Sequence, residues 1–180
     1  MKPNIARVLR PVGLSVLTTI VVGGTFWGIQ RLSTPKLELA PPETAPDFTL
    51  SQRLDGQSGA IRLADHRGHP VLVSFWASWC DACKEELGIL RELTGHPGRR
   101  ISIATGDEQA AALGAALKRD DDFVDAFDEG NRVADLYGLT GVPTTILIDA
   151  QGQIIHRWNR QLRATDLVVL LRHLEGKSLN

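Results

Sequence analysis

The sequence has few cysteines and no excess of charge of either sign. Its 180 residues include two cysteines, and the formal net charge is −1. This balance provides no basic surplus for nucleic acid and no acidic run that would form a solvating tail. We also find no internal repeat and no low-complexity stretch. The composition therefore favours an ordinary globular domain that does not act on nucleic acid.

Motifs for metal ions and phosphate groups are also missing. The five histidines are scattered without ligand spacing, which argues against a hydrolytic metal site. Asp120-Asp121-Asp122 lacks the spaced acidic ligands and the glycine of a calcium loop. Gly23-Gly24 and Gly95 have neither the lysine nor the following helix of a phosphate loop. We therefore expect no metal and no bound cofactor.

Both cysteines lie in one short stretch, where Cys80 and Cys83 are separated by two residues. Upstream, Val71–Phe75 is a β-branched apolar run that predicts a buried strand. Downstream, apolar residues recur at helical spacing, which places Cys80 at the start of a helix. Unpaired N–H groups and the helix dipole favour a thiolate there, and the thiolate is the nucleophile of thiol–disulfide exchange. Cys83, on the inward stripe of the helix, is expected to be the shielded partner.

Two other roles for the cysteine pair compete with redox chemistry. A structural disulfide that closes so short a loop removes little chain entropy, so it would stabilise the fold only slightly. A zinc site needs two further ligands, and the sequence has no second cysteine pair and no His-x-x-x-His run. We therefore interpret the pair as a redox centre that carries its own disulfide and needs no added cofactor.

The N-terminal segment predicts a membrane anchor. Residues 12–29 are uncharged and mostly apolar, and as a helix they would measure about 27 Å, just enough to cross the hydrocarbon core. Three basic residues precede this segment and two follow it, so the positive-inside bias is slight. A cleaved signal peptide is the alternative, but it needs a shorter apolar core and a small-residue cleavage site. We expect a cytoplasmic tail over 1–11, a transmembrane anchor over 12–29, a Pro-rich linker over 30–44 and a globular domain over 45–180.

The rest of the chain predicts an α/β domain. Short alternating segments at 47–50 and 61–63 flank turn residues and indicate a β-hairpin. The expected elements that follow are a strand over 71–75, a helix to about 94, a strand over 101–105, a helix over 108–119, an irregular acidic stretch, a helix over 132–137, strands over 145–149 and 153–158, and a helix over 165–175. Alternating strands and helices with a final strand pair predict a mixed sheet covered on both faces.

A second chemical landmark is Gly141-Val142-Pro143-Thr144-Thr145, directly before an apolar strand. Proline is the only residue that takes a cis peptide bond at modest energy, and in a sheet it is confined to edges, bulges or the first position of a strand. A cis bond would turn the Val142 backbone outward, where its N–H and C=O could pair with an extended peptide. An ordinary trans proline at the start of a strand is the alternative.

These motifs together resemble the thioredoxin superfamily, through Phe75–Cys83, Gly141–Thr145 and Leu147-Ile148-Asp149. With Ala45–Leu50 and the anchor, the chain is more narrowly similar to the membrane-anchored TlpA, ResA and CcmG (DsbE) group. The resemblance covers residues 45–175. It implies a thioredoxin-like α/β fold with a mixed central sheet flanked by helices, an added N-terminal β-hairpin, and a cis Pro143.

The resemblance also implies a function. Cys80 would form a mixed disulfide with a protein substrate, Cys83 would resolve it, and Trp79, Val142 and Pro143 would dock the substrate chain. In several members of the group the substrate is apocytochrome c, and a membrane thiol reductase of the DsbD or CcdA type supplies electrons. We therefore expect a monomeric thiol:disulfide oxidoreductase on the outer side of the cytoplasmic membrane, acting as a reductant.

Three positions bear on the direction of electron flow. Asp81 would oppose ionisation of Cys80 and so favour a reductant, unless it points to solvent or only caps the helix. Glu86 matches a glutamate of the ResA-like group thought to assist proton transfer, and the alternative is a solvated carboxylate. Ser74 stands where thioredoxin has a buried aspartate, which gives more weight to Glu86 or water as the proton carrier.

Three other functions stay open at this point. An oxidase or isomerase of the same fold would differ in reduction potential. A copper-handling thioredoxin-like module would resemble Cys-x-x-x-Cys with a distal histidine, whereas here the spacing is two residues. A redox-inert binding domain would not need Cys80. The sequence does not specify the client protein.

Overall fold

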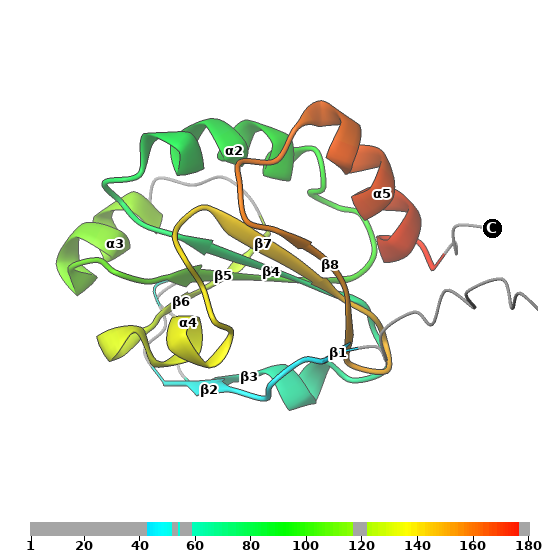
Figure 1. Ribbon diagram of the computed structural model, residues 1–180, viewed down its shortest axis with the longest axis horizontal. Coiled ribbons are helices and arrows are strands. Elements are labelled where there is room, and N and C mark those ends of the chain that lie inside the picture. Colours follow the sequence, from blue (N-terminus) through cyan, green and yellow to red (C-terminus); the bar gives the residue numbers. More distant parts are fainter. Residues whose placement is uncertain (1–42, 52–53, 55–58, 117–121, 177–180) are drawn as a thin grey trace, which may run out of the picture. The chain divides into compact units, whose positions relative to one another are not determined.

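A computed structural model describes residues 43–51, 54, 59–116 and 122–176 (Figure 1). The predicted cytoplasmic tail, the anchor and most of the linker lie outside these residues. Within the described part of the chain, no helix combines the length and the apolar character needed to span a membrane.

A six-stranded mixed sheet forms the centre of the domain, in the order β1-β8-β7-β4-β5-β6. The strands are β1 (Glu43–Thr44), β4 (Val71–Trp76), β5 (Arg99–Ala104), β6 (Val124–Phe127), β7 (Thr144–Ile148) and β8 (Gln153–Trp158). β4, β5 and β6 are parallel, while β7 is antiparallel to β4 and to β8. All six residues of β4 are buried, as expected for a central strand covered on both faces. The predicted mixed sheet is therefore confirmed.

Helices cover both faces of the sheet. In Figure 1, α2 (Asp81–Arg91) and α5 (Ala164–Leu174) lie on one face, and α4 (Arg132–Leu136) lies on the other with the hairpin. α3 (Gln109–Ala116) connects β5 to β6. The period-2 geometry of β4 divides its side chains between two cores. Val73 and Phe75 pack with the hairpin and α4, whereas Leu72 packs with leucines of α2 and α5.

The predicted hairpin is present in shortened form. β2 (Thr49–Leu50) pairs antiparallel with β3 (Ile61–Arg62), and a short 3-10 helix, η1 (Leu63–His66), follows. Buried apolar side chains of the hairpin join the core beneath the sheet, and the hydroxyl of Tyr137 donates to the carbonyl of Pro46 at 2.7 Å. The hairpin therefore closes one face of the sheet.

Two strands depart from the expected pattern. Val124–Phe127 was expected to be irregular and acidic, but it forms the parallel edge strand β6, in register with Ile101–Ala104 of β5. This prediction was wrong because a four-residue strand with a central aspartate has little local strand signal, and pairing with β5 decides its conformation. β1 pairs with β8, so the sheet starts two residues before the predicted domain boundary at 45.

The end of α2 also differs from the prediction. The helix ends at Arg91 rather than near Thr94. Tighter turns follow it, in which the N–H groups of Leu93 and Thr94 donate to carbonyls three residues back, at 3.0 Å each. Such turns are common where an α-helix ends. The predicted last part of the α3 helix lies outside the described residues.

Candidate redox site

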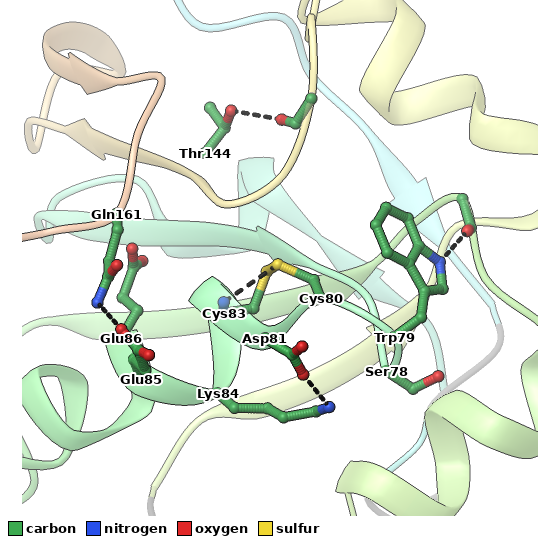
Figure 2. The surroundings of a disulfide bond; sticks show 12 residues. Ser78, Trp79, Cys80, Asp81, Cys83, Lys84, Glu85, Glu86, Thr144 and Gln161 are labelled. Carbon is green, nitrogen blue, oxygen red and sulfur yellow. Dashed lines mark hydrogen bonds and ion pairs between the residues drawn. A yellow bond between two sulfur atoms is a disulfide. The ribbon is translucent and has the colours of Figure 1, made fainter.

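The two cysteines form a disulfide at the start of α2, just after the short connection from β4. The S–S distance is 2.06 Å, and Cys80 is the N-cap residue of α2 (Figure 2). The backbone N–H of Cys83 donates to Cys80 Sγ at 3.1 Å. A hydrogen bond to a charged form stabilises it, so the same N–H would support a Cys80 thiolate after reduction. The predicted strand-to-helix location of the pair is confirmed.

Exposure does not distinguish the two cysteines. Cys80 is 6% exposed and Cys83 is 5% exposed, and both belong to a cluster with Trp76, Ala104 and other apolar residues. The expectation that Cys83 is shielded is met, but Cys80 is shielded almost as well. What separates them is the N-cap position of Cys80, where the free N–H groups of the helix converge.

Asp81 faces solvent on the outer side of α2. Its carboxylate accepts a hydrogen bond from the Lys84 ammonium at 2.7 Å, and Figure 2 shows it directed to that lysine. The hydrogen bond and the charge of Lys84 lower the pKa of Asp81. Of the two alternatives for this residue, the structure supports the solvent-facing one, with the negative charge offset by a neighbouring cation.

Glu86 lies one turn beyond Cys83 and is buried, with 1% of its surface exposed. One carboxylate oxygen accepts from the Thr145 hydroxyl and the other from the Leu162 backbone N–H, both at 2.8 Å. Burial raises the pKa of Glu86, while the two hydrogen bonds and the charge of Arg160 act in the opposite direction. The alternative of a solvated carboxylate is therefore wrong, and a role in proton transfer remains a prediction.

Ser74 lies in the same layer as the Glu86 carboxylate. On β4 it is opposite Ser102 of β5 and Thr145 of β7, and all three are buried. Thr145 in turn holds Glu86. The Glu86 carboxylate of α2 therefore contacts Thr145, which lies opposite Ser74 in this row of buried hydroxyl residues.

The proline loop lies against the disulfide cluster. The Val142–Pro143 peptide bond is cis, as expected, and Pro143 precedes β7. The Thr144 hydroxyl donates to the carbonyl of Gly141 at 2.8 Å and closes the turn. Val142 is partly buried and packs against the cluster that contains both cysteines. The fold thus brings two motifs together that lie about sixty residues apart in the sequence.

Trp79 is the most exposed large apolar residue beside the disulfide, with 63% of its surface accessible. Its indole N–H donates to the carbonyl of Gly106 at 2.8 Å (Figure 2). The preceding residue, Ser78, donates both its backbone N–H and its hydroxyl to the carboxylate of Asp107. The β5–α3 loop therefore fixes the segment that leads to Cys80.

Sequence reasoning did not single out Asp107, nor Asn131, whose side-chain oxygen accepts from the Gly106 N–H at 2.6 Å. One signal was available for Asp107. It follows a predicted strand parallel to the one that ends near Cys80, and the carboxyl ends of neighbouring parallel strands meet at one edge of a sheet. Asn131 had no such signal, because β6 before it was not predicted.

Among the described residues, no three His, Cys, Asp or Glu side chains come together so that they could hold a metal ion. Two of the histidines do meet: His156 and His173 lie edge to face, with ring centroids 5.4 Å apart. Burial and the neighbouring His173 lower the pKa of His156. Both rings belong to the α5 side of the sheet and take no part in the disulfide site.

The fold and the paired cysteines define a thioredoxin-like domain suited to dithiol–disulfide exchange. Residues 41–157 match the AhpC/TSA family, and the chain belongs to this family. The thiol-disulfide oxidoreductase ResA of Bacillus cereus is 31% identical over 159 residues, which cover 86% of this chain and 88% of that protein. ResA of Geobacillus kaustophilus is 28% identical over 180 residues, with 98% of each chain covered.

Solved structures agree with these relatives. A crystal structure assigned as the thiol:disulfide interchange protein DsbE from Chlorobium tepidum superposes with a TM-score of 0.62 and 26% identity. The match covers 77% of this chain and 98% of that one. The chain is a thiol:disulfide oxidoreductase of the ResA/DsbE type.

Proposed function

We propose that this oxidoreductase is a membrane-tethered, extracytoplasmic reductant of protein disulfides. Its clients would resemble apocytochrome c, and a membrane thiol reductase of the DsbD or CcdA type would return electrons to it. The direction of electron flow, from this dithiol to the client, is inferred from the burial of both cysteines and of Glu86, one helical turn beyond Cys83. Low polarity and a nearby carboxylate both disfavour a thiolate, which weakens the reduced form and makes the dithiol a better electron donor.

In the first step, the Cys80 thiolate attacks one sulfur of a client disulfide. A Cys80–client bond forms, the client S–S bond breaks, and the first client sulfur leaves as a thiolate that takes a proton from water. The Cys83 N–H, which already donates to Cys80 Sγ, supports the attacking sulfur. Val142 and Trp79 would dock the client chain on either side of the reacting sulfur.

In the second step, Cys83 attacks Cys80 Sγ and releases the second client sulfur as a thiolate. Cys83 must first lose its proton, and Glu86 is the buried acceptor one helical turn away, with a pKa raised by burial. The client gains two electrons and becomes a dithiol, while Cys80 and Cys83 return to the disulfide. The membrane reductase then reduces that disulfide.

The test of the direction is the reduction potential of the full chain in detergent, measured at equilibrium with glutathione or dithiothreitol. We expect a value at the reducing end, close to the roughly −270 mV of thioredoxin. A value near the roughly −120 mV of DsbA would overturn the reductant assignment. Cys83→Ser provides the control, because it cannot form the intramolecular disulfide.

An oxidase of the same fold is the second candidate. The observation that favours it is the hydrogen bond from Cys83 N–H to Cys80 Sγ at the N-terminus of α2, since both features stabilise a thiolate. The same potential measurement separates the two functions. An oxidase would also convert a reduced client dithiol to a disulfide in a single turnover.

The client is identified by trapping. A Cys83→Ala variant cannot resolve the mixed disulfide, so clients should remain attached to Cys80. We expect a haem-binding Cys-x-x-Cys protein among them, and a Cys80→Ala, Cys83→Ala double variant should capture none. A set of trapped clients without cytochromes would show another envelope pathway.

The anchor is tested by fractionation. The predicted span over 12–29 should keep the full chain in membranes after alkaline extraction, whereas a chain lacking residues 1–29 and exported by another signal should be soluble. A shortened, released form of the full chain would show a cleaved signal peptide instead.

A further inference from the structure

A groove of about 230 Å³ opens beside the disulfide. Its lining includes Trp79, Gly106, Asn131, Asp135, Leu139 and Val142. Trp79 directly precedes Cys80, and Val142 packs on the cluster of both cysteines. A client chain bonded to Cys80 would therefore pass along this groove.

One wall of the groove is held in place before any client arrives. The indole of Trp79 donates to the carbonyl of Gly106 at 2.8 Å, and the N–H of Gly106 donates to Asn131 Oδ1 at 2.6 Å. The hydroxyl of Thr105 donates to the same Asn131 oxygen at 3.0 Å. Because the exposed ring is fixed through its polar edge, little side-chain freedom is lost when a client packs on it.

The opposite wall offers backbone groups. Within the described part of the chain, the N–H and C=O of Val142 make no hydrogen bond. Leu139 adds a partly buried apolar surface. An extended peptide can add main-chain hydrogen bonds to such an edge, while its alternate side chains enter the groove. Neither the Trp79 wall nor the Val142 wall distinguishes one client from another by charge.

Among the residues that the structure describes, Asp135 is the only ionisable one that lines the groove. It lies on α4 and is exposed. Within the described residues, its carboxylate has no hydrogen bond and no ion pair. Asp81, the exposed acidic residue next to Cys80 in the sequence, already has Lys84 as its partner. The groove therefore carries one negative charge that nothing in the described chain neutralises.

We propose that Asp135 makes this groove selective for client segments with a lysine or arginine close to the reacting cysteine. This inference rests on the proposed reductase function and adds a specificity-determining residue to it. A basic side chain would pair with the carboxylate while the chain lies between Trp79 and Val142. An acidic side chain at the same place would be repelled. The chemical exchange itself would be unchanged.

The test uses the reduced full chain and three synthetic peptides. Each peptide contains one disulfide, and they differ only in carrying lysine, glutamine or glutamate beside the cysteine. Tryptophan fluorescence follows formation of the Cys80–Cys83 disulfide. Rates are divided by those of the same peptide with dithiothreitol, which removes differences in peptide reactivity. We expect the lysine peptide to react about threefold to fivefold faster than the glutamine peptide at low salt, and the glutamate peptide to be slowest.

Three variants decide the outcome. Asp135→Asn should abolish the preference, and Asp135→Lys should reverse it toward the glutamate peptide. Glu108→Gln, which removes an exposed carboxylate outside the groove lining, should keep the wild-type preference. Equal preference in the wild type and Asp135→Asn would overturn the selectivity while leaving the reductase function intact. No reduction of any of the three peptides would overturn both.

Discussion

The two faces of α2 place a carboxylate in opposite situations. On the outer face, the Asp81 side chain is 89% exposed, and Lys84 lowers its pKa. On the inner face, Glu86 is 1% exposed, and burial raises its pKa against two hydrogen bonds. Only five positions separate them in the sequence. The comparison shows that the helix face, rather than the residue type, decides whether an acidic side chain is buried or faces solvent.

Of the changes to these two carboxylates, removal of the buried one should have the largest effect on stability. Glu86→Ala should lower the free energy of unfolding by about 3 kcal/mol, because the Leu162 N–H and the Thr145 hydroxyl lose their acceptor and a cavity remains. Urea denaturation of the oxidised chain in detergent measures the loss. In the control, Glu86→Gln, the amide oxygen accepts from Leu162 and the NH₂ donates to the Thr145 oxygen. That change should cost less than about 1 kcal/mol. Equal losses in both variants would show that the two hydrogen bonds do not matter.

Thr145→Val removes one of the two donors but keeps the shape of the side chain. We expect a loss of about 1.5 kcal/mol, because a buried oxygen of Glu86 is left without its hydrogen bond. The bond also lowers the pKa of Glu86, so the variant should move the pH profile of client reduction to higher pH. Thr144→Val is the matched control, since that hydroxyl binds Gly141 instead. An unchanged profile in Thr145→Val would separate Glu86 from the proton step.

The buried Glu86 should also make the stability of the domain depend on pH. Because the folded-state pKa of Glu86 is raised above the unfolded value of 4.5, the folded state binds more protons in the window between the two values. The contribution of Glu86 to stability is therefore full below pH 4.5 and is lost as pH rises through the folded pKa. Glu86→Gln should lack this decline, because its amide does not titrate. Parallel curves for wild type and variant from pH 4 to 8 would contradict a raised pKa.

The smallest effect is expected on the outer face. Asp81→Asn should change the rate of client reduction by less than about twofold, because the carboxylate is exposed and already paired with Lys84. Stopped-flow fluorescence of the reduced chain measures this rate, and Lys84→Gln serves as the companion variant. A large rate increase in Asp81→Asn alone would mean that the charge acts on Cys80 after all.

Some of these features were predictable because their signals are local. The strand at 71–76 and the helix after Cys80 follow from short-range apolar patterns, so the position of the disulfide between them was predicted correctly. The cis bond before Pro143 was expected from the family motif and is present. The hairpin was expected from turn residues between two alternating segments, and its short strands pair as predicted.

Other features depend on distant parts of the chain. The burial of Glu86 requires Leu162, which is 76 positions away and lies in the loop between β8 and α5. Helical periodicity alone left Glu86 open to either face. Likewise, β6 becomes a strand by pairing with β5. Its central aspartate interrupts the apolar pattern that would otherwise predict a strand there.

By itself, the sequence determined the chemistry of the centre: two cysteines at the start of a helix, a Gly-Val-Pro motif before an apolar strand, and a resemblance to a family in which such centres exchange disulfides. These depend on residue types and short spacings, which folding cannot alter. Only the tertiary structure decided which acid is buried, which loop holds Trp79, and that Asp135 lines the groove. Burial and charge pairing depend on contacts between segments that are far apart in the sequence, and short-range patterns do not predict those contacts.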